Sequence, residues 1–98
     1  MFDKMKQLME MQRTMQEMKR KLDATVFEVA SSDALVIVRM NGSQEIQQVA
    51  LSADYQKAGQ AQLEKSLKDT YNKAIKRSHE LAAAEMKKVT GMNIPGLS

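Results

Sequence analysis

The stretch Leu35-Val36-Ile37-Val38-Arg39-Met40, followed directly by Asn41-Gly42, decides the fold of this chain. It is rich in β-branched residues, and Asn-Gly accepts the positive φ angles of a tight type I′ turn. The sequence therefore predicts a strand over residues 35–40 that ends in a hairpin. Apolar side chains alternate onto both faces of this strand, so we expect both faces to be covered.

Two further strand-like segments flank this central one. Residues 25–31 are rich in β-branched and aromatic side chains, and Ser31-Ser32-Asp33 after them favours a turn. Residues 44–51 follow the Asn-Gly pair and have strand character as well. Together the three segments predict a three-stranded antiparallel meander.

Both ends of the chain have helical periodicity. Over residues 2–23 apolar side chains recur at steps of three and four and form one helical stripe. This Met stripe consists of Leu8, Met11, Met15, Met18 and Leu22. Residues 60–90 repeat the pattern, with Ala74 on the apolar face and Tyr71 expected in the core, and Gly91 predicts the end of that helix. Residues 52–59 form a loop or a short helix, and residues 91–98 form a tail.

The 98 residues are enough for one domain, residues 1–98, of the α+β class. The chain has no cysteine and one histidine, His79, which excludes disulfides, thiolate chemistry and an imidazole pair for zinc. No nucleophile, base and oxyanion donor occur as a recognisable set. We therefore expect no enzymatic activity, no catalytic residues, no metal, no cofactor and no small-molecule substrate.

Targeting features are missing from this sequence as well. The first ten residues carry charges at four positions, and no apolar run of 18 residues occurs. We expect a soluble, cytoplasmic protein without a membrane partner.

A three-stranded sheet with two helices leaves strand edges and the Met stripe bare. Association of two copies about a two-fold axis would hide both features. We therefore expect a homodimer whose interface includes the Met stripe together with Val36 and Val38. The alternative is a helix pair within one chain that buries the stripe without a partner.

Positive charge gathers at the two ends of the chain. Lys and Arg outnumber Asp and Glu by six to four in residues 1–24 and by seven to four in residues 60–98, while the middle segment is acidic. Basic groups spaced along exposed helices suit DNA phosphates, because each contact releases condensed counterions. The cluster Lys19-Arg20-Lys21 ranks first and Lys76-Arg77 second. The candidate DNA-binding residues are Lys6, Arg13, Lys19, Arg20, Lys21, Lys65, Lys73, Lys76, Arg77 and Lys87.

Two other interpretations compete with DNA binding. Ion pairs between residues four apart, such as Lys6–Glu10 and Arg13–Glu17, would make the first helix a solvated, salt-bridged surface, and composition alone favours this outcome. Alternatively, the Met stripe or a strand edge captures another protein, and the chain is a protein–protein interaction module.

Several segments resemble the YbaB/EbfC nucleoid-associated proteins, and the resemblance extends over nearly the whole chain. It rests on the Met-, Gln- and Lys-rich opening helix, the strand that ends in Asn41-Gly42, the long second helix, and the tail Gly91-Met92-Asn93-Ile94-Pro95-Gly96. The chain departs from the family at Ser31-Ser32-Asp33-Ala34, where glycines are usual, and at Ser52-Ala53, where an acidic residue and proline are common.

The resemblance implies a homodimer with helices projecting from a shared sheet. It also implies binding to duplex DNA in the bacterial cytoplasm, association with the nucleoid, and a role in nucleoid organisation or gene regulation. The family has no established enzymatic activity or cofactor.

Overall fold

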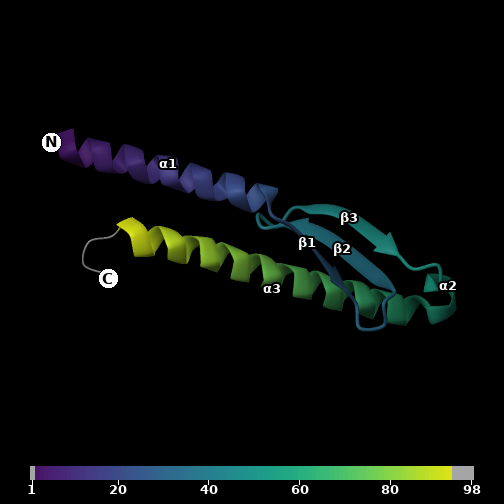
Figure 1. Ribbon diagram of the computed structural model, residues 1–98. Coiled ribbons are helices and arrows are strands. Elements are labelled where there is room, and N and C mark those ends of the chain that lie inside the picture. The colour runs from purple at the N-terminus through teal and green to yellow at the C-terminus, as the bar shows by residue number, and fades with distance from the viewer. Residues whose placement is uncertain (1, 94–98) are drawn as a thin grey trace.

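A computed structural model describes residues 2–93 and, within them, the side chains of residues 2–88. The elements in chain order are α1 (Phe2–Ala24), β1 (Val26–Ala30), β2 (Val36–Asn41), β3 (Ile46–Leu51), α2 (Tyr55–Ala58) and α3 (Gln60–Asn93). The predicted α+β order of long helix, three strands and long helix is confirmed (Figure 1). The segment predicted as a loop or short helix contains the single-turn helix α2.

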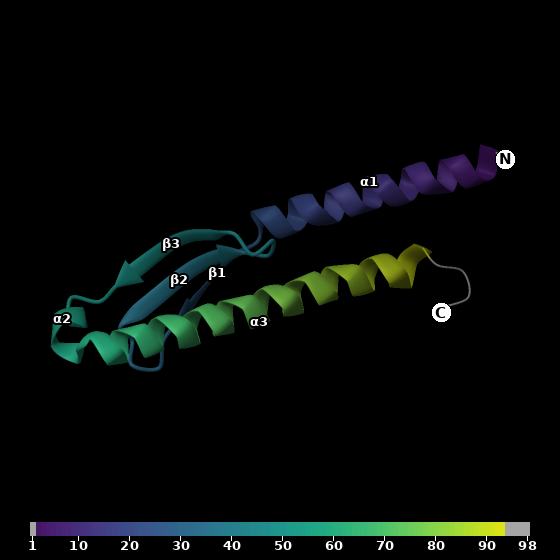
Figure 2. The ribbon, with the colours of Figure 1, turned by 180° about the vertical axis from the view of Figure 1, so that it is seen from behind.

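The three strands form an antiparallel sheet in the order β1-β2-β3, as predicted. Val29 pairs with Val38, and Val38 pairs with Val49, so these side chains share one face. The long helix α3 runs along that face, while α1 extends past the end of the sheet (Figures 1 and 2).

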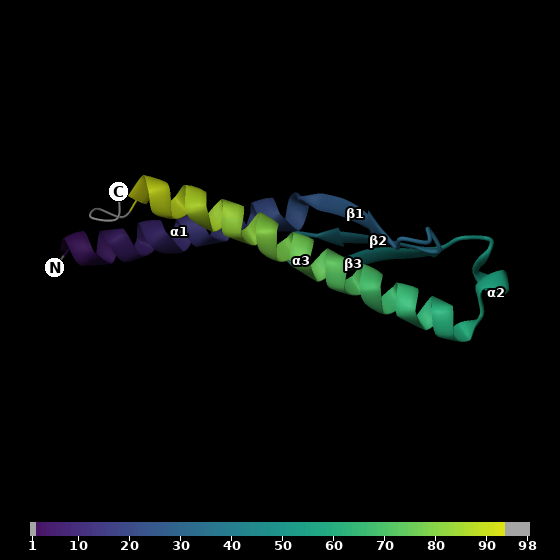
Figure 3. The same ribbon diagram turned by 90° about the horizontal axis from the view of Figure 1, so that it is seen from below.

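The expectation that both faces of β2 are covered is wrong for the single chain. Val36, Val38 and Met40 are at most 3% exposed beneath α3, whereas Ile37 on the opposite face is 41% exposed. The reason is topological: α3 covers one face, and α1 projects away instead of crossing the other (Figure 3). Val36 and Val38, which were expected at a dimer interface, are therefore buried in the core of the single chain.

Small side chains let α3 approach the sheet closely. Ser66, Thr70, Ala74 and Ser78 are all buried and recur every four residues along one side of α3. Two of the three buried hydroxyls are satisfied within the helix, since Thr70 Oγ1 donates to the carbonyl of Ser66 and Ser78 Oγ to that of Ile75, both at 2.7 Å. The third, Ser66 Oγ, donates to the carboxylate of Asp33. Tyr71, expected in the core, is instead 47% exposed, because the small residues occupy the contact.

The turn between β2 and β3 differs from the predicted type I′ hairpin. The residue with a left-handed backbone is Gln44, with φ of 65°, and Asn41 N donates to the carbonyl of Glu45 at 3.0 Å. The loop therefore has three residues, and β3 begins at Ile46, which pairs with Met40. The register shifts just after this pair, because Arg39 pairs with Gln48. Gly42 has a different role: a Cβ there would lie 2.8 Å from Leu22 Cδ2, so glycine permits α1 to approach the turn.

The turn between β1 and β2 is organised around Asp33. Its Oδ1 accepts hydrogen bonds from Ser31 Oγ at 2.6 Å and from the backbone N–H of Leu35 at 3.1 Å. Its Oδ2 accepts from Gln62 Nε2 at 3.2 Å and from Ser66 Oγ. This carboxylate therefore joins the turn to the first part of α3.

The predicted end of the second helix at Gly91 is wrong, because α3 continues to Asn93. An internal glycine costs a helix only about 1 kcal/mol, which a long helix tolerates. The remainder of the predicted tail, residues 94–98, lies outside the described residues. Within residues 2–93 no helix is both long and apolar enough to cross a membrane.

Candidate nucleic-acid interface

The helix α1 is an arm that joins the sheet at its C-terminal end and extends away from it (Figure 1). Exposure along the Met stripe rises steadily with distance from that end, from 7% at Leu22 through 42% at Met15 and 60% at Met11 to 65% at Leu8. Packing within one chain therefore leaves the outer part of the stripe bare. The N-terminal half of α1 projects freely beside the C-terminal half of α3.

A row of basic side chains follows α1. At about 100° per residue, Lys6, Arg13 and Arg20 lie on one line, on the side of the helix opposite the Met stripe. All three are exposed, and among residues 2–88 none of them forms an ion pair. The predicted i,i+4 pairs of Lys6 with Glu10 and of Arg13 with Glu17 are thus not formed in this part of the chain. The positive charge of the row is available to an external anion.

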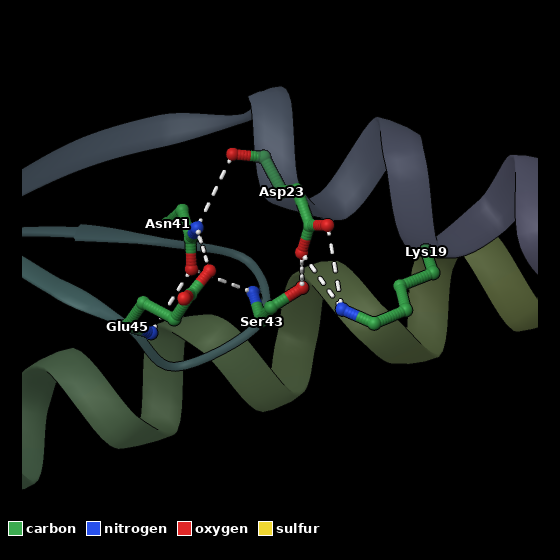
Figure 4. Close-up of polar contacts among 5 residues, drawn as sticks. All are labelled: Lys19, Asp23, Asn41, Ser43 and Glu45. Carbon is green, nitrogen blue, oxygen red and sulfur yellow. Dashed lines mark hydrogen bonds and ion pairs between the residues drawn. The ribbon is translucent and has the colours of Figure 1, made fainter.

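Lys19, in the cluster ranked first from sequence, has a partner within the chain. Its Nζ lies 3.3 Å from both carboxylate oxygens of Asp23, which also accepts a hydrogen bond from Ser43 Oγ (Figure 4). The Ser43 hydrogen bond, with Lys19, lowers the pKa of the Asp23 carboxyl against the opposing effect of burial. Of the three basic residues, Arg20 and Lys21 remain exposed and without an ion pair among the described side chains.

Some of the basic residues of α3 also have partners within the chain, and others do not pair with acidic residues among residues 2–88. Lys65 and Lys76 are exposed and form no ion pair among residues 2–88. By contrast, Lys73 Nζ donates to the carbonyl of Ala30 at 3.3 Å, and Arg77 lies 3.5 Å from Glu80. Lys87 is exposed near the far end of α3. The structure therefore places all ten candidates on the two long helices, and Lys19, Lys73 and Arg77 contact neighbouring groups of the chain.

Sequence reasoning missed the residues that join the arm to the sheet. Asn41 Nδ2 donates to the carbonyl of Asp23 at 3.2 Å and to Glu45 Oε1 at 2.8 Å, while Ser43 bonds to the Asp23 carboxylate (Figure 4). The only sequence signal was the Asn-Gly pair, which indicated a turn and gave no sign of a contact with residues about twenty positions earlier.

The described side chains offer little else that could bind a ligand. No group of three or more His, Cys, Asp or Glu residues within them is arranged to hold a metal ion. A shallow hollow of about 150 Å³ lies on the bare face of the sheet and is lined by Glu28, Ile37, Arg39, Gln48 and Ala50. It is smaller than the roughly 300 Å³ at which small-molecule pockets begin.

Fold and charge together define a small α+β protein with basic helical arms on a three-stranded sheet. The model of the YbaB/EbfC DNA-binding family matches residues 1–93, so the chain belongs to this DNA-binding, nucleoid-associated family. The resemblance seen in the sequence is thereby confirmed.

Individual relatives agree with the family match. A nucleoid-associated protein of Clostridium novyi is 33% identical over 95 residues, which cover 95% of this chain and 83% of the relative. A nucleoid-associated protein of Syntrophobacter fumaroxidans is 33% identical over 101 residues, which cover 98% and 89%. The crystal structure of an uncharacterized Helicobacter pylori protein shares the fold, with a TM-score of 0.52 and 24% identity over 81% of this chain and 96% of that one.

Proposed function

We propose that this chain binds duplex DNA chiefly through phosphate contacts from the exposed Lys and Arg residues of α1 and α3. Family membership supports DNA as the partner. The observation that carries the proposal is the row Lys6, Arg13 and Arg20, which is exposed on a projecting helix and unpaired with acids among the described side chains. Phosphate contacts position a protein without reading base sequence, so binding is weakly specific.

The relatives named above are called nucleoid-associated proteins. We propose the same location for this chain, in the bacterial cytoplasm on the nucleoid, with a role in nucleoid organisation or gene regulation. A protein with little sequence preference binds many sites along a chromosome, as such a role requires.

A salt titration of DNA binding tests this function. Each phosphate contact contributes about −0.9 to the slope of log K against log salt concentration, so five contacts give a slope of roughly −4.5. The measurement uses random-sequence duplex DNA and fluorescence anisotropy between 50 and about 200 mM salt, the range in which such proteins lose much of their affinity. Affinity that does not change with salt would contradict the phosphate mechanism.

We also propose that the chain forms a homodimer, and the exposed apolar residues of β3 support a particular surface for it. Ile46, Val49 and Leu51 of β3 pair with Met40, Val38 and Val36, so they share the core-facing side of the sheet. They are nevertheless 44–49% exposed, because α3 covers β1 and β2 instead. β3 is also an edge strand without a charged residue or proline between Ile46 and Leu51.

Two exposed apolar residues of α3 extend this surface. One side of α3 faces β1, because Lys73 bonds to Ala30 of β1 and Ser66 bonds to Asp33 in the β1–β2 turn. We call this side the β1 flank of α3 and the opposite side the β3 flank. Leu67 and Tyr71 lie about 120–160° around the helix from Lys73, on the β3 flank, and are 37% and 47% exposed. We name Ile46, Val49, Leu51, Leu67 and Tyr71 the β3 patch. Its exposed apolar side chains and its unpaired strand edge fit a second copy of this chain.

The interaction-module alternative rests on a separate observation. Leu8, Met11 and Met15 of the Met stripe are 65%, 60% and 42% exposed on α1. Flexible methionines accommodate partner surfaces of varied shape. A gel shift with random duplex DNA distinguishes the two functions, because the alternative requires no DNA binding.

A further inference from the structure

The C-terminal turn of α1 meets the β2–β3 turn at a polar joint. The carboxylate of Asp23 accepts hydrogen bonds from Ser43 Oγ and from Lys19 Nζ, and its backbone carbonyl accepts one from Asn41 Nδ2 at 3.2 Å (Figure 4). Asn41 is itself held in place, because its Oδ1 accepts from the backbone N–H groups of Ser43 and Glu45, both at 3.0 Å. Asn41 and Ser43, which bond to Asp23, are thus held in position by hydrogen bonds within the β2–β3 turn.

An apolar contact supports this joint. Leu22, 7% exposed, is the one buried residue of α1, and it lies directly over Gly42. The backbone N–H of Gly42 donates to the carbonyls of Leu22 and Thr25, both at 2.9 Å. The joint therefore combines a buried leucine, backbone hydrogen bonds and the Ser43–Asp23 and Asn41–Asp23 contacts within one helical turn.

Beyond the joint, the rest of α1 has little support. Residues 2–21 are exposed, except for the half-buried Thr14 and Met18. The 23 residues of α1 span roughly 34 Å, so a rotation of about 10° at the joint displaces the far end by roughly 6 Å. Phosphates of one DNA strand are about 3.4 Å apart along the helix axis, so this displacement is enough to change which phosphates the arm meets.

We propose that the joint sets the orientation of α1 and thereby aligns its basic row for DNA, with Ser43 and Asp23 as positioning residues. The consequence for DNA rests on the proposed function, whereas the orientation of the arm does not. The same geometry assigns Lys19 to the joint, where it neutralises Asp23, and leaves Lys6, Arg13 and Arg20 for phosphate contacts.

The orientation is measured directly with two spin labels. The chain has no cysteine, so Gln12→Cys on α1 and Ala84→Cys on α3, both exposed, give a specifically labelled protein. Dilution with excess unlabelled chain keeps the measured distances within one chain whatever the oligomeric state. Ser43→Ala should make the distance distribution roughly twice as wide, since one of the few contacts of the joint is lost.

Two control variants test whether a wider distance distribution is specific to the loss of the Ser43 hydroxyl. Ser43→Thr keeps the hydroxyl and should restore the narrow distribution. Ser32→Ala, at an exposed serine in the turn at the other end of the sheet, should leave the distribution unchanged. The thermal midpoint of Ser43→Ala should stay close to that of the wild type, because the core between α3 and the sheet is untouched. An unchanged distance distribution in Ser43→Ala would overturn the proposal.

DNA binding supplies the second measurement. A loosened arm occupies its binding orientation for a smaller fraction of the time, so Ser43→Ala should bind roughly three- to tenfold more weakly. Its salt dependence should equal that of the wild type, because the bound complex keeps the same phosphate contacts. A wider distance distribution with unchanged affinity would overturn the link to DNA. Absence of salt-dependent binding by the wild type would overturn the proposed function, while the distances would still test the joint.

Discussion

Gly42 shows how a single residue links two elements. A Cβ at this position would lie 2.8 Å from Leu22 Cδ2 and 3.0 Å from the Leu22 carbonyl oxygen, and the latter is backbone that cannot easily move. We expect Gly42→Ala to destabilise the protein by about 1–3 kcal/mol, as overpacking does. Urea unfolding measures this change, with Gly59→Ala as a comparison: nothing lies within 4 Å there, and its positive φ of 85° is the only source of strain. Equal stability of Gly42→Ala and wild type would argue against the close contact.

Asp33 makes stability depend on pH. Hydrogen bonds from Ser31 and Ser66, and from the backbone N–H of Leu35, hold the pKa of its carboxyl well below the ordinary value. A lowered pKa in the folded state stabilises the protein above the unfolded value, near 3.9, and this contribution is lost as pH falls toward the folded value.

We therefore expect the thermal midpoint of the wild type to fall as the pH drops below about 4. In this range Asp33 is protonated in the unfolded chain while it is still ionised in the folded one. Asp33→Asn, which does not titrate at this position, should have a lower midpoint at neutral pH and a shallower decline on acidification. Thermal unfolding followed by circular dichroism between pH 7 and about pH 2.5 measures both effects. Parallel declines in the two proteins would assign the acid sensitivity to other carboxyls.

At the level of the element, α3 depends on small residues where it crosses the sheet. Ala74 is a residue of α3 that is fully buried where this helix packs on β2, whereas Ala83 on the same helix is exposed. Ala74→Leu adds three carbon atoms to a filled contact and should cost about 1–3 kcal/mol, while Ala83→Leu should cost well under 1 kcal/mol. Urea denaturation compares the two variants directly. Similar stabilities would mean that the contact between α3 and the sheet adjusts easily.

The basic row of α1 is likewise a property of an element. Replacing Lys6, Arg13 and Arg20 together by Gln should weaken binding to all duplex sequences alike and make the salt slope shallower by roughly 2.7, or 0.9 for each lost contact. Lys57→Gln, on α2 and 4.0 Å from Asp54, serves as the control. This result would differ from that of Ser43→Ala, for which the slope is expected to stay constant. An unchanged slope in the triple variant would place the phosphate contacts elsewhere.

At the scale of the whole molecule, the β3 patch predicts how two copies associate. Val49→Lys places a charge in the patch, at a residue that is 49% exposed, and should convert the proposed dimer to a monomer. Ile37→Lys introduces the same charge at a residue that is 41% exposed on the opposite face, and should leave the dimer intact. Light scattering measures the mass of both variants. A dimeric Val49→Lys, or a monomeric Ile37→Lys, would assign the interface to another surface.

The sequence by itself determined the order of helix, meander and helix, the basic character of the two long helices, and the family. These properties are local, because hydrophobic periodicity, turn residues and charge are read from neighbouring positions. Only the tertiary structure decided that α3 covers one face of the sheet, that Gly42 accommodates Leu22, and that Ser43 bonds to Asp23. The exposure of the apolar residues of β3 was not readable from the sequence either, because it depends on where α3 lies, and no local pattern encodes that placement.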